Sequence, residues 1–167
     1  MPWVNGKGTT IEMLRVEREG HLILRLSRAM VVEDGAFSLF PGIERSLTML
    51  SGPGFELVGE GLHLRAAPLN PVAFAGDIPV RAEGVAAPCE DFNVMTAREV
   101  PCAEVRVQQG GQVGADCAVL ALAAGLIGGL RVAQYDLVIA DQPLSLDMSV
   151  IIVRADGVQQ YLSMARV

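Results

Sequence analysis

Residues 37–45 read FSLFPGIER and lead into residues 46–52, SLTMLSG, a run that has the alternation of a β-strand and ends at a glycine. The dipeptide Pro41-Gly42 predicts a turn just before this strand. Glu44 and Arg45 then place opposite charges where the strand begins. An aromatic residue, a turn and a charged pair in this order are unusual in an ordinary hairpin. This stretch therefore guides the interpretation of both the fold and a pocket.

Short runs with strand alternation recur along the chain, whereas helical periodicity is scarce. The strand candidates are residues 22–26, 45–50, 54–58, 62–64, 72–74, 80–82, 105–107, 130–132, 137–139, 150–153 and 161–164. Glycine, proline and aspartate separate them in turn-forming combinations. The pattern predicts an all-β fold of the sandwich or barrel type. Alanine is dense at residues 115–124, where the sequence leaves a helix open.

Composition and charge narrow the class of protein. With 167 residues, 51% of them hydrophobic, the chain is long enough for one domain or two small halves that share a core. The net charge is −6 and the 13 basic residues are scattered, which argues against a nucleic-acid partner. The longest apolar run, residues 118–130, is too short to cross a membrane. Charges throughout residues 1–30 argue against a secretory signal, so we expect a cytoplasmic protein.

Metal and cofactor chemistry have little support in the sequence. A site for a first-row metal usually combines several histidines with a carboxylate, but the chain has only His21 and His63, which are far apart. Cys89, Cys102 and Cys117 show no metal-binding spacing and are expected to be free thiols. We therefore expect neither a metal nor a cofactor.

Two further segments mix polar and apolar residues in a similar way, MPWVNGKGTT at residues 1–10 and DFNVMT at residues 91–96. Together with residues 37–45 they resemble the motifs of the HutD/Ves family, a group of cupin-like (RmlC-type) β-barrel proteins. Two positions depart from the family pattern. Val4 stands where a lysine is usual, and Lys7 where relatives tend to have glycine.

The resemblance implies a fold and a biological context. It implies a bicupin, in which two packed β-barrels or jelly-roll-like halves lie in one chain. We expect residues 1–167 to form a single compact unit with approximate halves 1–86 and 87–167. The resemblance also implies a regulator linked to histidine utilisation that senses a small carboxylate such as N-formylglutamate. The family has no established enzymatic mechanism, and the fold by itself cannot supply one.

The first candidate ligand-binding residues lie in the glycine-bearing loop near the start of the chain. Asn5, Lys7 and Thr9 belong to a loop whose backbone N–H groups could face an anion. The alternative is a tight connection before a strand, in which Asn5 bonds to the backbone.

The other candidates lie in the two later motifs. Arg45 could pair with Glu44 or Asp91, or clamp a ligand carboxylate in a bidentate fashion. Phe40 is either a pocket wall or part of the core. Asp91, Asn93 and Met95 alternate along the chain, so their side chains share one face of a strand. Facing inward, they would line a barrel; otherwise they would form a polar network between strands.

Three functions remain open on this basis. The first is a small-molecule binding protein without a metal, which takes a small carboxylate in a barrel lined by these residues. The second is a metal-independent enzyme that uses Asp91 as a general base, although no Ser-His or Cys-His arrangement accompanies it. The third is a scaffold or homodimer without a ligand, which the mean hydropathy of +0.38 leaves open. We favour the first and do not expect an enzyme.

Overall fold

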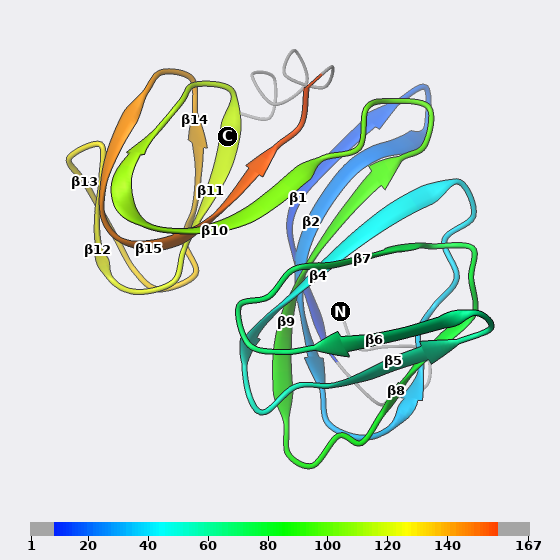
Figure 1. The fold of residues 1–167 in the computed structure, drawn as a ribbon. Helices are drawn as coiled ribbons and strands as arrows, with labels where there is room; N and C mark the ends of the chain where they lie inside the picture. Colours follow the sequence, from blue (N-terminus) through cyan, green and yellow to red (C-terminus); the bar gives the residue numbers. More distant parts are fainter. Residues whose placement is uncertain (1–8, 157–167) are drawn as a thin grey trace. The chain divides into compact units, whose positions relative to one another are not determined.

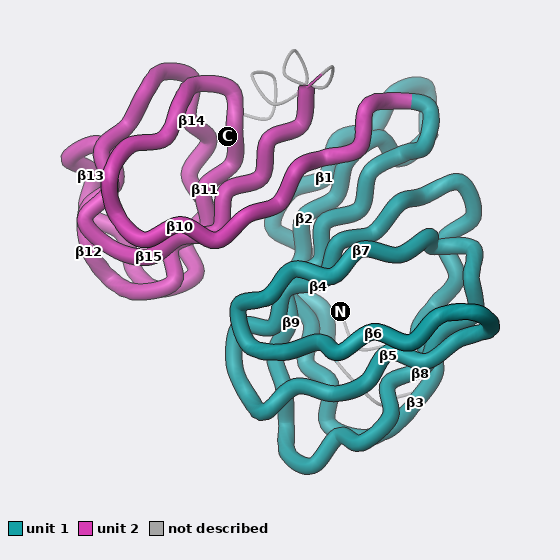
Figure 2. Tube along the Cα trace, viewed as in Figure 1, with its two compact units in different colours: residues 1–99 teal, residues 100–167 magenta. Residues whose placement is uncertain are grey.

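The structure is a computed structural model that describes residues 9–156. It divides the chain into two compact units, residues 1–99 and 100–167 (Figure 2). Every regular element in the described part of the chain is a β-strand, which confirms the all-β prediction. The boundary between the two units lies after Glu99 and not near residue 86, because β9 (Cys89–Ala97) pairs with strands of the first unit. That the whole chain forms one compact bicupin stays a prediction.

The first unit consists of two sheets. The five-stranded sheet has the order β1-β2-β9-β4-β7, and the four-stranded sheet has the order β3-β8-β5-β6 (Figure 1). Besides β9, the strands are β1 (Thr10–Arg18), β2 (His21–Val31), β3 (Gly35–Ala36), β4 (Ile43–Ser51), β5 (Phe55–Gly59), β6 (Leu62–Ala66), β7 (Val72–Ala75) and β8 (Val80–Glu83).

A hydrophobic core lies between these two sheets. Leu47 and Met49 from the larger sheet pack with Phe55 and Leu57 from the smaller one, and Cys89 of β9 belongs to the same cluster. All five side chains are fully buried. Burial of an apolar side chain of this size contributes roughly 1.5–3 kcal/mol, so this core holds the two sheets face to face. Side chains that share the face of Cys89 on β9 therefore point between the sheets.

The second unit is built around one long strand. Its strands are β10 (Glu104–Val113), β11 (Cys117–Ala121), β12 (Gly125–Ile127), β13 (Leu130–Val132), β14 (Leu137–Ala140) and β15 (Leu144–Arg154). β15 pairs with β10 along one edge and with β11 and β12 along the other. Val119, Val150 and Ile152 are among the buried residues of its core. The strands curl around this core (Figure 1).

The helix left open at residues 115–124 is not present, and β11 lies there instead. All five residues of β11 are buried, and the strand pairs with β14 on one side and β15 on the other. Two strand partners satisfy its backbone, which outweighs the preference of alanine for a helix. The strand candidate at residues 161–164 lies outside the described residues. Within residues 9–156 we find no helix long and apolar enough to cross a membrane.

Candidate functional site

The candidate site begins with three alternate side chains at the centre of the five-stranded sheet. Asp91, Asn93 and Met95 share the face of Cys89 on β9, so they point between the two sheets of the first unit. All three are buried. Strand pairing places β2 on one side of β9 and β4 on the other. The row of polar groups is thus enclosed by its own sheet and by the sheet opposite.

Strand register brings Arg45 of β4 beside this row. Arg45 pairs with Met95 on one side and with Phe74 of β7 on the other. Its side chain is buried, with a relative exposure of 5%. Its immediate neighbour Glu44 points to the opposite face of the sheet and does not pair with Arg45. Glu44 instead accepts a hydrogen bond from Arg98 Nε at 2.7 Å. Of the two ion-pair partners that the sequence left open, only Asp91 lies on the face of Arg45.

Three phenylalanine rings surround the guanidinium of Arg45. Its Cζ atom lies 5.2 Å from the ring centre of Phe37, 5.4 Å from that of Phe40 and 4.9 Å from that of Phe74. At these distances the rings attract the cation and hold it in place. Nη1 donates a long hydrogen bond of 3.5 Å to the backbone oxygen of Ser38. Nε has no hydrogen-bond partner within the described part of the chain.

A chain of hydrogen bonds links Arg45 to Asp91. Arg45 Nη2 donates to Asn93 Oδ1 at 2.8 Å, and Asn93 Nδ2 donates to Asp91 Oδ1. The other oxygen of this carboxyl, Asp91 Oδ2, is buried and has no partner among residues 9–156. Unpartnered buried polar atoms are rare and costly in folded proteins. Each end of this hydrogen-bond chain therefore has unused hydrogen-bonding capacity.

Burial shifts the protonation of both charged groups. It raises the pKa of Asp91 to about 7, although the positive charge of Arg45 opposes this shift. Burial also lowers the pKa of Arg45 to about 10, which the negative charge of Asp91 opposes. Arg45 therefore stays a cation at neutral pH, whereas Asp91 exchanges its proton near neutrality. The pair carries a net positive charge whenever Asp91 is protonated.

The segment before β4 positions Phe40 against Arg45. Pro41 and Gly42 form a turn that a 3.2 Å hydrogen bond from Ile43 N to Phe40 O closes, and Gly42 has φ +75°. Glycine meets this requirement without strain. Gly76 N donates to Ile43 O at 2.7 Å, and Phe40 N donates to Gly76 O at 2.8 Å. The segment is thus bound on both sides of the turn to one glycine.

Gly76→Ala is expected to destabilise the first unit. A Cβ atom at this position would lie 2.6 Å from Phe40 O and 2.9 Å from Ile43 O, which forces the backbone apart. Such overpacking costs roughly 1–3 kcal/mol in the free energy of unfolding, measured by urea denaturation. Gly35→Ala is the matched control, because a Cβ atom there meets nothing within 4 Å. Equal stability of the two variants would contradict the close packing at Gly76.

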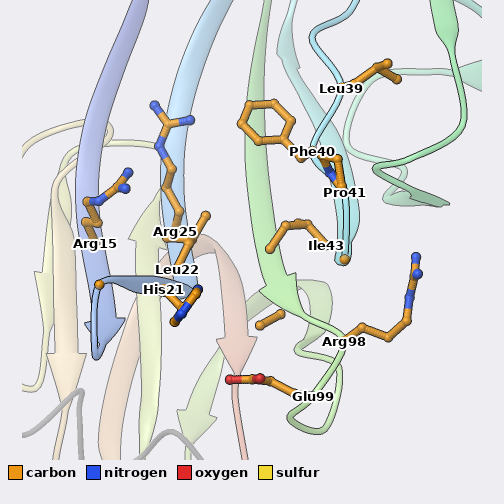
Figure 3. A pocket seen from close by; sticks show the side chains of 13 residues that line it. Arg15, His21, Leu22, Arg25, Leu39, Phe40, Pro41, Ile43, Arg98 and Glu99 are labelled. Atoms are coloured by element: carbon orange, nitrogen blue, oxygen red, sulfur yellow. The ribbon is translucent and has the colours of Figure 1, made fainter.

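A pocket of about 670 Å³ opens beside this cluster. It lies where the β1–β2 hairpin, the turn before β4 and the end of β9 meet (Figure 3). The lining residues are Arg15, Gly20, His21, Leu22, Arg25, Leu39, Phe40, Pro41, Gly42, Ile43, Ala97, Arg98 and Glu99. Phe40 lines the pocket and also contacts Arg45, so one aromatic ring connects the pocket to the buried cation. Three arginines line the pocket, Arg15, Arg25 and Arg98. Each is paired with carboxylates, namely Arg15 with Glu12 and Glu17, Arg25 with Glu12, and Arg98 with Glu44 and Asp77.

Hydrogen bonds from Arg98 connect two segments at the edge of this pocket. It donates to both carboxylate oxygens of Asp77, at 2.8 and 2.9 Å, and its backbone N donates to Gly42 O at 2.8 Å. Hydrogen bonds from Arg98 are the main reason that the pKa of Asp77 falls to about 2. The side chain of Arg98 is therefore engaged in holding the turn at residues 41–42 against the end of β9.

The structure brings five of the eight predicted ligand-binding residues together. Phe40, Arg45, Asn93, Asp91 and Met95 form one cluster with the contacts given above. Thr9 lies apart from it: its side chain is exposed, and its backbone oxygen accepts a hydrogen bond from Met30 N at 3.0 Å. Asn5 and Lys7 lie outside the described residues.

Sequence reasoning missed Arg25, which lies in the same row of side chains. Arg25 of β2 pairs with Met95 on the side opposite Arg45. It is buried and also lines the pocket. The sequence did contain a signal for this residue, an arginine inside the apolar run Leu22–Leu26. A charged side chain in a buried strand usually has a partner, which makes it a candidate for a site.

The two histidines do not take part in the cluster. His21 is exposed at the pocket, and His63 lies on β6 with Nε2 at 3.2 Å from Glu56 Oε2. Among residues 9–156, no three histidine, cysteine or acidic side chains gather in a way that could hold a metal ion.

Comparison with known proteins agrees with the resemblance seen in the sequence. The HutD family model matches residues 1–160. An uncharacterized 21.2 kDa protein in the hutC 3′ region of Pseudomonas putida is 38% identical over 100 residues. These residues are 58% of this chain and 53% of that relative, so the match spans about half the length of the relative.

Solved structures give the same picture of the fold. HutD from Pseudomonas fluorescens SBW25, solved in a formate condition, is 28% identical and has a TM-score of 0.78, with 94% of each chain covered. A Cupin 2 conserved barrel domain protein from Leptotrichia buccalis has a TM-score of 0.60 with 89% of each chain covered. Its identity is only 9%, so this second likeness concerns the fold alone. The fold is thus cupin-like.

Proposed function

Because this chain belongs to the HutD family, we propose that it is a small-molecule binding protein that takes a small carboxylate in its first unit without a metal. The proposal includes a regulatory role linked to histidine utilisation, with N-formylglutamate as the candidate ligand. It also takes the two units to be the two cupin-like barrels of a bicupin. The place of the Pseudomonas putida relative in the hutC 3′ region supports the link with a histidine-utilisation locus.

One observation carries the proposal, namely the caged guanidinium of Arg45. Three phenylalanine rings hold the cation, Asn93 takes one of its N–H groups, and Nε has no partner among the described residues. A planar guanidinium with a free edge is suited to bind a carboxylate through two parallel hydrogen bonds. In an environment with little water, such a charge-assisted bond is stronger than at the surface.

The pocket supplies a route towards this cage. Arg15, Arg25 and Arg98 line it, and each of them already pairs with a carboxylate. The pocket therefore offers N–H donors to a ligand rather than an excess of positive charge. Phe40 stands between the pocket and Arg45, so an anion that enters the pocket reaches the wall of the cage first.

Isothermal titration calorimetry with N-formylglutamate tests the proposal. We expect saturable heat with a dissociation constant below 1 mM, which corresponds to more than about 4 kcal/mol of binding free energy. The diamide of the same compound is the matched control, because it keeps the shape and lacks both negative charges. Formate tests whether the smallest carboxylate binds at all. The absence of heat at millimolar concentrations of every acid tested would contradict the proposal.

A second candidate function, general-base catalysis by Asp91, rests on its pKa of about 7. A carboxyl with such a pKa accepts a proton readily at neutral pH, as general bases do. Against this, the carboxyl of Asp91 is fully buried and is bonded to the amide of Asn93 rather than to a second acid–base group. Binding is therefore the better supported function. The third alternative, a scaffold or homodimer, stays a prediction.

A further inference from the structure

A pocket of about 710 Å³ is formed entirely by residues of the second unit. It lies where β12, β13, β15 and the loop after β13 meet. Val132, which is buried, and the aliphatic side chain of Leu126 belong to its lining, and its charged lining residues are Arg131, Asp136 and Asp147. A concave site with an apolar surface and a few polar groups is where small molecules usually bind.

The main chain of β12 holds Asp147 of β15 in this pocket. The two strands pair through Ile127 and Leu146, and next to this pair Asp147 Oδ1 accepts a hydrogen bond from Leu126 N at 2.7 Å. The carboxylate lies close to Gly125, where a Cβ atom would come within 2.5 Å of Oδ1. Glycine at this position therefore leaves the space that the carboxylate occupies.

The loop after β13 anchors Asp136 in a similar way. Its Oδ2 accepts a hydrogen bond from Ala133 N at 2.8 Å, and its backbone oxygen accepts one from Ala121 N at 3.0 Å, which ties the loop to β11. Asp136 and Asp147 thus each use one carboxylate oxygen on a main-chain donor. The other oxygen of each carboxylate accepts no hydrogen bond from residues 9–156.

Arg131 is the cation of the pocket, and it is exposed on β13. It forms neither a hydrogen bond nor an ion pair with another residue of the described part of the chain. Arg131 pairs with Leu126 across the strands, and Leu126 lies beside Asp147, so two strand spacings of together about 10 Å separate the Cα atoms of Arg131 and Asp147. Because main-chain donors hold the carboxylates in place, opposite charges share one pocket without pairing.

We infer that this pocket is a second binding site, which takes a small zwitterion with its ammonium group facing Asp136 and Asp147 and its carboxylate on Arg131. An ammonium group has three donors for the two carboxylates, and a guanidinium group is the preferred partner of a carboxylate. A simple anion meets two carboxylates that repel it, and a simple cation leaves Arg131 without a partner. The inference goes beyond the proposed function, because it concerns the other unit and another class of ligand.

Glycine, 4-aminobutyrate and 6-aminohexanoate test this inference, each compared with the acid that lacks the amino group and with the amine that lacks the carboxylate. The backbone amide signals of Leu126 and Ala133 in NMR spectra are the readout, because these groups donate to the two carboxylates. We expect at least one amino acid to shift both signals with a dissociation constant in the millimolar range. The matching acid and amine should bind about tenfold more weakly, as the loss of one charge-assisted hydrogen bond predicts.

Two substitutions separate the charges of the pocket from its fold. Asp147→Asn keeps an acceptor for Leu126 N but removes a negative charge, so the preference for the amino acid over the simple acid should fall. Arg131→Met should remove the preference for the amino acid over the amine. Asp141→Asn and Arg106→Met are the matched controls, because both residues are exposed in the same unit and do not line the pocket. Both controls should keep both preferences.

Equal affinities for the amino acids and for their matching acids and amines would overturn the inference. Preferences that survive both Asp147→Asn and Arg131→Met would also overturn it, as would unchanged signals of Leu126 and Ala133 at tens of millimolar ligand. These two signals belong to the second unit, so the result is independent of carboxylate binding in the first unit. Failure of this inference therefore leaves the proposed function intact.

Discussion

Arg45→Met is expected to weaken carboxylate binding by roughly thirtyfold to several thousandfold. Methionine fills much of the same space inside the phenylalanine cage but carries no charge and donates no hydrogen bond. Removal of one partner from a buried charged hydrogen bond costs about 2–5 kcal/mol of binding free energy, mostly through faster dissociation. Calorimetry with N-formylglutamate measures the loss.

The same substitution is expected to lower stability, and this effect must be measured separately. Without Arg45, Asn93 loses its donor and Asp91 loses the charge that favours its ionised form. Leaving a buried hydrogen-bonding group without its partner in this way costs about 1–3 kcal/mol. Urea denaturation of Arg45→Met is compared with that of Arg65→Met, a control at an exposed arginine of β6 that does not line the pocket. A folded Arg45→Met protein that still binds N-formylglutamate with unchanged affinity would refute the role of the caged guanidinium.

Asp91→Asn is expected to remove a fall in stability between about pH 4 and pH 7. Burial raises the pKa of the folded Asp91 to about 7, from an ordinary value of 3.8. Between these values the folded protein holds a proton that the unfolded chain has released, so stability decreases as pH rises. The full shift corresponds to about 4 kcal/mol. Asparagine carries no titrating proton, and the stability of the variant should not follow this curve.

Urea denaturation at pH 4.5, 6.0, 7.5 and 8.5 tests this expectation. Asp77→Asn is the control, since the exposed Asp77 has its pKa lowered to about 2 by hydrogen bonds from Arg98. The stability that Asp77 contributes is lost only as pH falls through about 4 to 2, outside the measured window. The control should therefore keep the fall in stability that the unmodified protein shows. A fall that persists in Asp91→Asn would mean that another group causes it.

The sequence predicts the strands well where one face is apolar and the other polar. β4 and β6 are clear for this reason, since their buried and less buried residues alternate. β1 was not recognised, because register shifts between Glu12 and Leu14 and between Val16 and Glu17 interrupt its alternation. Dense alanine left a helix open at residues 115–124. The strand β11 there lacks alternation because both of its faces are buried.

In the candidate site, too, features that depend on local sequence could be predicted, whereas those that depend on strand pairing could not. Asp91, Asn93 and Met95 could be placed on one face because a strand has a period of two residues. That Arg45 reaches them depends on the pairing of β4 with β9, which joins residues far apart in the sequence. The cage needed a further long-range pairing, since Phe74 comes from β7. Arg25 was not predicted as a site residue, because a local sequence pattern does not show which strand will pair with the strand that carries it.

The attachment of Phe40 to Gly76 has a consequence for the speed of ligand exchange. Main-chain hydrogen bonds hold residues 40 and 43 on both sides of the turn, so the backbone of this pocket wall is already ordered before a ligand binds. Little ordering entropy is then lost on association, and no closing movement of this turn has to precede capture. Arg45, however, lies behind the side chain of Phe40 and does not line the pocket, so that ring has to move before a ligand reaches the guanidinium. We therefore expect association to be slower than the diffusion limit.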